Sequence, residues 1–232
     1  MVTEERTHSG LHDNLHELGR RARRRHETLN RLFVAAMELF ARKGFATTKV
    51  EDITEAADVG KGTFFNYFPS KEHVLAHFAG KQAAKVEHCL GLAKQGDVGT
   101  HEVLSSLARD LARVPGKSPE MARALVLSLL GNAEVRDFIL HEMENGRAMI
   151  AEIMKLGQER GELRRDLDPI DMACAFQQSL FGTVLLWSLK AKSPLSRLLD
   201  NTISVLYQGL QAPSVHRAAG TTHSPDRERK SK

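Results

Sequence analysis

The side chains best suited to chemistry in this 232-residue chain lie in one short polar stretch, which contains Lys61, Gly62, Thr63, Asn66 and Tyr67. Thr63 is three residues before Asn66 and four before Tyr67, so a helix presents all three on one face. An asparagine amide can bind an adenine edge, and a threonine methyl can contact the thymine methyl. The free N–H groups at the start of such a helix, next to the charge of Lys61, suit a phosphate. The stretch therefore predicts contact with DNA.

The residues around this stretch predict two short helices joined by a tight turn. Thr48 and Glu51 have the types and the spacing of a capping box, which would begin the first of them. Asp58 lies in the turn, where a left-handed backbone is needed, and aspartate tolerates that conformation better than most residues. The apolar positions that pack both helices onto a preceding helix, itself ended by Gly44, are Ile53, Ala57, Val59, Phe64 and Phe68. Three helices in this order predict a helix-turn-helix unit.

Positive charge is concentrated before and within this unit. Residues 20–49 hold nine Lys or Arg and two acidic residues, a net charge of +7, whereas residues 101–200 hold 13 basic and 14 acidic residues. The arginines of residues 20–25 have two interpretations. They form either an arm that binds the minor groove or phosphates, or a solvated extension of the first helix. Their position beside the helix-turn-helix unit favours the arm.

Residues 32–75 resemble the DNA-binding domain of the tetracycline-repressor (TetR) family of regulators. The matching segments are AAMELF (35–40), KGF (43–45), TKVEDI (48–53), KGTFFNYF (61–68) and SKE (70–72). Three departures are Phe65, where tyrosine is common, Gly60, where a serine or threonine cap is usual, and Thr54 with Asp58, where alanine and glycine are common. The resemblance implies a homodimer that binds a palindromic double-stranded operator, with the third helix of each subunit in the major groove.

The residues that we expect to contact DNA are Thr48, Lys49, Lys61, Gly62, Thr63, Phe65, Asn66, Tyr67 and Lys71. Lys71 starts the next helix, where its charge opposes the helix macrodipole. A phosphate is its expected partner.

The rest of the chain has helical apolar patterns, and no useful segment alternates with period two. We predict an all-α fold of about nine helices. It has an N-terminal three-helix, homeodomain-like helix-turn-helix unit and a C-terminal helical domain, to which the resemblance assigns ligand binding and dimerisation. The expected parts are a flexible basic arm (1–25), the helix-turn-helix domain (26–72), the effector-binding and dimerisation domain (73–211) and a disordered basic tail (212–232).

Large, adaptable side chains in the second domain suit a permissive apolar pocket, although plain core packing explains each of them too. These candidates are Phe138, Met143, Met149, Met172, Phe176 and Trp187. Glu142, Gln177 and Gln178 could orient a polar group of the ligand. In the family, the last two helices usually form the dimer. The candidates for that interface are Gln177, Phe181, Val184, Leu195, Leu199 and Leu206.

Other chemistry has little support. His73, His77 and His88 lack partners at a metal-ligand spacing, and no P-loop or nucleophile-elbow motif occurs, so no metal, cofactor or enzyme activity is expected. Cys89 and Cys174 lie in apolar helical stretches and are expected to be buried, reduced thiols. The polar N-terminus and the absence of a long apolar run predict a cytoplasmic protein with no membrane partner.

The function we expect is a ligand-responsive DNA-binding transcriptional regulator, a repressor released from its operator by an apolar small-molecule effector. The alternative is an architectural or accessory DNA-binding protein on the same scaffold without an inducer. A second domain with no cavity would favour that alternative. A helical enzyme or ligand carrier with a purely structural N-terminal unit is a third possibility, and it predicts no salt-dependent DNA affinity.

Overall fold

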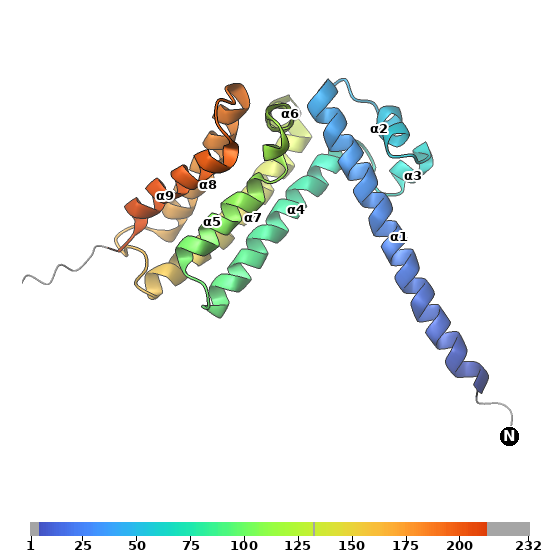
Figure 1. The fold of residues 1–232 in the computed structure, drawn as a ribbon, viewed down its shortest axis with the longest axis horizontal. Helices are drawn as coiled ribbons and strands as arrows, with labels where there is room; N and C mark the ends of the chain where they lie inside the picture. The colour runs from blue at the N-terminus through green and yellow to red at the C-terminus, as the bar shows by residue number, and fades with distance from the viewer. Residues whose placement is uncertain (1–4, 132, 213–232) are drawn as a thin grey trace, which may run out of the picture.

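The computed structural model describes residues 5–131 and 133–212, which form nine α-helices, one short 3-10 helix and no β-strand (Figure 1). The helices are α1 (Glu5–Lys43), α2 (Val50–Ala56), α3 (Lys61–Phe65), α4 (Glu72–Gln95), α5 (Thr100–Ala112), η1 (Pro115–Lys117), α6 (Pro119–Gly131), α7 (Ala133–Glu159), α8 (Pro169–Leu189) and α9 (Leu195–Leu210). The all-α prediction is confirmed. The predicted tail lies, after Ala212, outside the described residues.

The N-terminal unit consists of α1, α2 and α3. Gly44 ends α1 in a left-handed conformation (φ 85°), and its N–H donates to the carbonyl of Phe40 at 3.0 Å. Asp58 forms the turn between α2 and α3 with φ 52°, the conformation predicted for it. Phe40, Ile53 and Phe64 are fully buried in the core that the three helices share.

The start of α2 differs from the prediction by one residue. Lys49 is the N-cap residue, and the carboxylate of Asp52 accepts its backbone N–H at 3.0 Å. Thr48 is buried instead, and its hydroxyl donates to the carbonyl of Gly44 at 2.7 Å. The predicted capping box of Thr48 and Glu51 is therefore wrong, because the turn after α1 uses the Thr48 hydroxyl.

Helix α1 has 39 residues, which corresponds to a length of about 58 Å. Its first half projects away from the rest of the molecule (Figure 1). The flexible arm predicted for residues 1–25 is therefore helical from Glu5 onward. Residues 5–25 contain no proline and are rich in Arg, Glu and Leu, which have high helix propensity. The helix predicted to begin after this segment therefore extends back through it.

Helices α4 to α9 form the second domain. Helix α7 packs between α4 and α8, and α9 packs on α8 and α5 (Figure 1). Leu107, Ile153, Met154 and Phe176 are fully buried in its core. The loop after α7 is tied to the end of α9, since the N–H of Arg164 donates to the carbonyl of Leu210 at 2.9 Å.

Two helices connect the domains. Helix α4 contributes Val74 and Leu75 to the N-terminal core and Val86 and Leu90 to the second core. Helix α6 packs on both α1 and α8. The predicted boundary at residues 72 and 73 thus coincides with the start of a continuous helix that contributes to both cores.

Among the described helices, α8 alone has the length and the apolar composition of a membrane-crossing helix, with a mean hydropathy of 1.2. Its apolar side chains have other uses in the fold. Phe176 and Leu180 belong to the core of the second domain, and Phe181 and Val184 line a cavity described below.

Candidate DNA-binding surface and effector cavity

The predicted reading residues lie on the outer surface of the N-terminal unit. Lys61, Gly62, Phe65 and Asn66 are exposed. Phe65 keeps 47% of its surface accessible, and a large exposed apolar side chain within a polar, basic surface is more informative than an exposed polar one. This surface is formed by the second helix of the helix-turn-helix, which is the helix that enters the major groove in such motifs.

Helix α3 is shorter than the predicted span to Tyr67. Asn66 is its C-cap residue, and the Asn66 N–H donates to the carbonyls of Gly62 and Thr63, each at 3.2 Å. Thr63 and Tyr67 are half-buried beside it. Asn66 is exposed, so its side-chain amide is available to a base edge.

Two lysines of this surface form ion pairs in the free protein. The Lys61 ammonium lies 2.5 Å from the carboxylate of Glu51, and that of Lys43 lies 3.2 Å from Asp52. The hydrogen bond from Lys61 lowers the pKa of Glu51, and the N–H of Lys49 together with Lys43 lowers the pKa of Asp52. A phosphate would have to compete with Glu51 for Lys61.

Lys71 is held inside the N-terminal unit. Its ammonium donates to the carbonyls of Phe45, Ala46 and Thr48 at 2.8, 3.2 and 3.1 Å, and lies 4.6 Å from the centre of the Phe45 ring. All three of its N–H bonds are thus used to hold the turn between α1 and α2. These carbonyls lie more than 20 residues earlier in the sequence, and binding them is a structural reason for a lysine at the start of α4. The sequence pattern alone predicted a phosphate as the partner of this lysine.

Thr48 is placed in the same way. Its side chain is buried against the turn, so the structure does not present its hydroxyl to DNA. Lys49, by contrast, is exposed. The structure therefore brings Lys49, Lys61, Gly62, Phe65 and Asn66 to the outer surface and uses Thr48 and Lys71 to shape it.

The arginine-rich part of α1 reaches the reading helix. The guanidinium of Arg25 lies 5.7 Å from the centre of the Tyr67 ring, a cation–π distance. Arg23 pairs with Glu27 one turn later on the same helix. Arg25 thus connects the basic extension to the end of α3.

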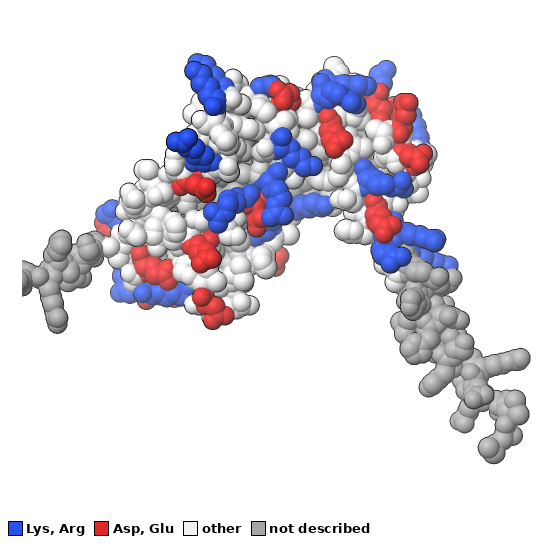
Figure 2. Space-filling view, in the orientation of Figure 1, with Lys and Arg blue, Asp and Glu red and all other residues white. Residues whose placement is uncertain are grey.

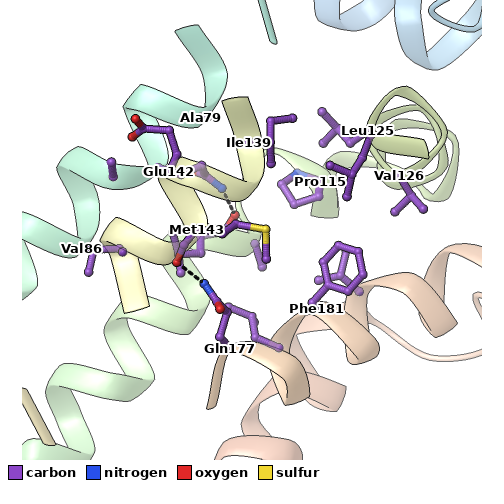
Figure 3. A pocket seen from close by; sticks show the side chains of 18 of the residues that line it. Ala79, Val86, Pro115, Leu125, Val126, Ile139, Glu142, Met143, Gln177 and Phe181 are labelled. Atoms are coloured by element: carbon purple, nitrogen blue, oxygen red, sulfur yellow. Dashed lines mark hydrogen bonds between the residues drawn. The ribbon is translucent and has the colours of Figure 1, made fainter. Parts of the chain in front are cut away.

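A cavity of about 220 Å³ lies within the second domain, bounded by α4, α6, α7 and α8 and by the end of α5 (Figure 3). This volume is well above the ~30 Å³ that one water occupies in the liquid, so the cavity has room for an apolar group of a ligand. Its lining is apolar apart from Gln82, Glu142 and Gln177.

The two glutamines of the lining are held by neighbouring groups. Gln82 donates to the carbonyl of Leu111 at 2.8 Å and accepts from Lys85 at 2.6 Å. Gln177 donates to the carbonyl of Met143 at 2.9 Å (Figure 3) and accepts from Arg147 at 3.0 Å. Glu142 is half-buried, and its carboxylate is turned toward α4 and away from Phe181 (Figure 3).

Two of the six predicted pocket residues, Met143 and Phe176, line the cavity. Met172 and Trp187 are buried in the core, where the indole N–H donates to the carbonyl of Ser193 at 3.0 Å. Met149 packs against that core, and Phe138 is 40% exposed. The sequence analysis missed the small and apolar residues that α4, α5 and α6 contribute, because their pattern is that of ordinary core residues. They are Ala79, Ala83, Val86, Leu111, Ala112, Ala122, Leu125, Val126 and Leu129.

The predicted dimer residues are also divided. Leu195 and Leu199 are buried in the chain's own core, which accounts for their apolar character without a partner. Gln177, Phe181 and Val184 line the cavity, and Leu206 is half-buried. The most exposed large apolar side chains of α8 and α9 are Leu186, Leu189 and Val205, at 67%, 62% and 71% exposed.

The histidines and cysteines remain separate. Within residues 5–131 and 133–212, no group of three or more His, Cys, Asp or Glu could hold a metal ion. Cys89 is buried, as predicted, but Cys174 is only half-buried. His77 lies edge-on to the rings of Phe33 and Phe68 at 5.4 and 5.8 Å, and its buried Nε2 has no hydrogen-bond partner among the described residues. Burial, with the charges of Lys81 and His26, lowers the pKa of His77.

Comparison with known proteins agrees with this geometry. The family model described as bacterial regulatory proteins, tetR family, matches residues 32–78. The transcriptional repressor KstR of Mycolicibacterium smegmatis is 22% identical over 202 residues, which cover 86% of this chain and 95% of that protein. FadR of Thermus thermophilus, a TetR-family repressor solved with lauroyl-CoA, is 31% identical with a TM-score of 0.55, covering 83% of this chain and all of that one. FadR of Bacillus subtilis, solved with stearoyl-CoA, has the same fold at 22% identity, with a TM-score of 0.64 over 78% of this chain and 98% of that one.

A helix-turn-helix unit followed by the continuous helix α4 and a helical domain with an apolar cavity, in a chain related to transcriptional repressors, identifies a ligand-responsive, DNA-binding transcriptional regulator. The chain belongs to the TetR family of bacterial regulatory proteins.

Proposed function

We propose that this chain is a repressor that binds a palindromic operator as a homodimer and leaves it when an acyl thioester enters the cavity. The observation that carries the proposal is the position of α4. One face of α4 lines the cavity with Ala79, Gln82, Ala83 and Val86, while its first turns pack in the core of the N-terminal unit. A ligand that displaces α4 therefore changes the position of α3 relative to DNA.

The proposed DNA contacts combine base reading and phosphate binding. Asn66 and Phe65 are exposed at the end of α3 and face the bases, whereas Lys49 and Lys61 bind phosphates. The arginines of α1 bind phosphates as well. A helix is about 10–12 Å wide and the minor groove is about 6 Å wide, so a helical extension follows the sugar–phosphate backbone and does not enter that groove as an extended arm.

The proposed effector has a long apolar chain. The two related repressors named FadR were solved with lauroyl-CoA and stearoyl-CoA, and the lining of this cavity is almost entirely apolar. Each methylene that leaves water contributes about 0.8 kcal/mol. Affinity is therefore expected to rise with chain length until the cavity is full.

The proposed dimer surface lies on α8 and α9. Leu186, Leu189 and Val205 are large apolar side chains that the monomer leaves exposed, and a second copy of the chain is the partner that covers them. The mass measured by light scattering in solution tests this: the proposal requires twice the mass of one chain.

The experiment for the whole proposal is a DNA-binding titration against the DNA that flanks the protein's own gene, at two salt concentrations, with random-sequence competitor and with or without lauroyl-CoA. We expect sequence-specific binding with a steep salt dependence and release by the acyl thioester. Binding that survives every acyl thioester, or no preference over random DNA, would contradict the proposal.

A pair of neighbouring alanines provides a matched control. Ala83 lines the cavity, whereas Ala84, the next residue of α4, is exposed and does not line it. Ala83→Trp fills the cavity, so the DNA affinity of this variant should no longer change when lauroyl-CoA is added. Ala84→Trp should bind DNA and be released by lauroyl-CoA as the parent is. The architectural alternative predicts a second domain without a cavity, so the cavity between α4, α6, α7 and α8 counts against it.

A further inference from the structure

Three basic side chains lie beside the cavity, at the place where α4 meets the end of α5. They are Lys81 and Lys85 of α4 and Arg113, the C-cap residue of α5, and together they are called the basic cluster here. Figure 2 shows Lys and Arg side chains gathered over this part of the surface. None of the three lines the cavity itself, whose described lining includes no Lys or Arg.

Gln82 connects the cavity to the basic cluster. Gln82 lines the cavity, and the oxygen of its side-chain amide accepts a hydrogen bond from Lys85 at 2.6 Å. Lys85 also donates to the carbonyl of Asp110 at 2.7 Å. Two of its three N–H bonds are thus used, and the third has no partner among the described residues. A polar group that leaves the cavity past Gln82 meets the ammonium of Lys85.

The basic cluster carries more positive charge than its neighbours compensate. Asp110 pairs with Arg113 and is the acidic group that acts on Lys85. Burial lowers the pKa of Lys85, and the nearby charges of Arg113 and Lys81 lower it further. Three cations thus lie close together, with the carboxylate of Asp110 beside them. Arg113 remains 72% exposed despite its ion pair. Glu142 lies near Ala79 (Figure 3), and Ala79 is on a different face of α4 from Lys81 and Lys85, which are one turn apart.

We propose that Lys81, Lys85 and Arg113 bind an anionic group of the effector, a phosphate or a carboxylate, at the edge of the cavity between α4 and α5. This rests on the proposed function, because the apolar part of the same ligand fills the cavity. The ligand class is then an anionic amphiphile. Lauroyl-CoA supplies phosphates and a fatty acid supplies a carboxylate, so both contain the required chemistry.

The basic cluster also touches the DNA-binding unit. The Lys81 ammonium lies 4.8 Å from the centre of the ring of Phe33, a buried residue of α1. An anion bound at the cluster attracts Lys81 and competes with this cation–π contact. The site that holds the anion therefore acts directly on the packing of α1 against α4, in addition to the displacement of α4 by the apolar chain.

The test measures the binding of lauroyl-CoA, laurate and 1-dodecanol, three ligands with the same chain and different head groups, by calorimetry at two salt concentrations. We expect both anions to bind more tightly than dodecanol. Lys81→Gln and Arg113→Gln should each weaken the anions about fivefold, as expected for one partly exposed charge contact, and should reduce the salt dependence. Dodecanol should bind all of these proteins equally.

Lys94→Met is the matched control, since Lys94 is on the same helix, far from the cavity, and pairs with Glu152. Its affinities should equal those of the parent. Lys85 is kept because its ammonium also holds the amide oxygen of Gln82 and the carbonyl of Asp110, so its substitution would disturb the cavity lining and the end of α5. The ratio of lauroyl-CoA to laurate affinity reports whether phosphates or a carboxylate occupy the cluster.

Different failures have different meanings. Equal affinities for all three ligands would overturn the anion site and leave the proposed effector class intact. A loss of anion affinity in Arg147→Gln, with no loss in Lys81→Gln or Arg113→Gln, would have the same meaning. No binding of any of the three ligands would overturn the acyl effector of the proposed function, and the anion site with it.

Discussion

Lys71→Met distinguishes a structural lysine from a phosphate-binding one. The ammonium of Lys71 donates to three carbonyls of the turn between α1 and α2, at 2.8–3.2 Å, and faces the ring of Phe45. We expect the variant to fold less stably. Its DNA affinity should fall for every sequence alike, because the turn that holds α2 is loosened.

The size of the effect follows from these contacts. A hydrogen bond to a charged group contributes about 1.5–3 kcal/mol. The contacts are part-buried or exposed, so water replaces a share of what the ammonium supplied. The expected loss in the free energy of unfolding is about 2–3 kcal/mol, which corresponds to about 4–12 °C in the melting temperature for a chain of this size.

The assay is thermal unfolding by circular dichroism, together with DNA affinity at several salt concentrations. Lys49→Met is the comparison, because Lys49 is exposed. That variant should keep its melting temperature and reduce the slope of log affinity against log salt by about 1. If Lys71→Met instead kept the parent's melting temperature and reduced the slope as Lys49→Met does, the structural role of Lys71 would be refuted.

Three further predictions concern other parts of the chain. Asn66→Ala should weaken operator binding by about 1–3 kcal/mol and leave random-sequence DNA unaffected; an equal loss on both in a competition titration would exclude a reading role. Gly157→Ala should lower the free energy of unfolding by about 1–3 kcal/mol, and with it the melting temperature, since the added Cβ would lie 2.7 Å from the Thr100 hydroxyl and 2.9 Å from Leu163. Gly182→Ala is its control, because there is open space around Gly182. Burial lowers the pKa of His77, so the folded state favours the neutral ring. The free energy of unfolding should therefore fall as the pH drops below 6.5 toward the lowered pKa. His77→Phe should reduce that pH dependence between pH 7.5 and 5.5, and identical pH profiles of the variant and the parent would contradict the assignment.

The coupling between the two domains has a simple structural basis. Helix α4 is continuous from the N-terminal core to the cavity, and α6 packs on α1 at the same end of the molecule. Because α4 is one helix, the displacement that we propose at Ala83 or Val86 would be carried along it to the N-terminal core. His77 and Lys81 lie on α4 between these regions and both contact the ring of Phe33, so this contact is where the proposed ligand would influence the reading helix.

The helix-turn-helix unit was determined by the sequence on its own. Its information is local: apolar residues at helical spacing, Gly44 at the end of α1, and Asp58 in the turn, which the structure places in the left-handed conformation. The exposed positions of Lys61, Phe65 and Asn66 follow from the same periodicity, because Phe64 and Phe68 must point inward.

The remaining assignments were decided by contacts between residues distant in the sequence. Lys71 binds carbonyls 23 to 26 residues earlier, and no local pattern reveals that pairing. The cavity is a space that Ala83, Leu111, Val126 and Phe181 fail to fill, although each has the sequence signature of a packed core residue. Periodicity identifies which face of a helix is apolar. Whether that face meets the chain's own core, as at Leu199, a cavity or open solvent depends on how the helices are placed against one another, and this is a property of the tertiary structure alone.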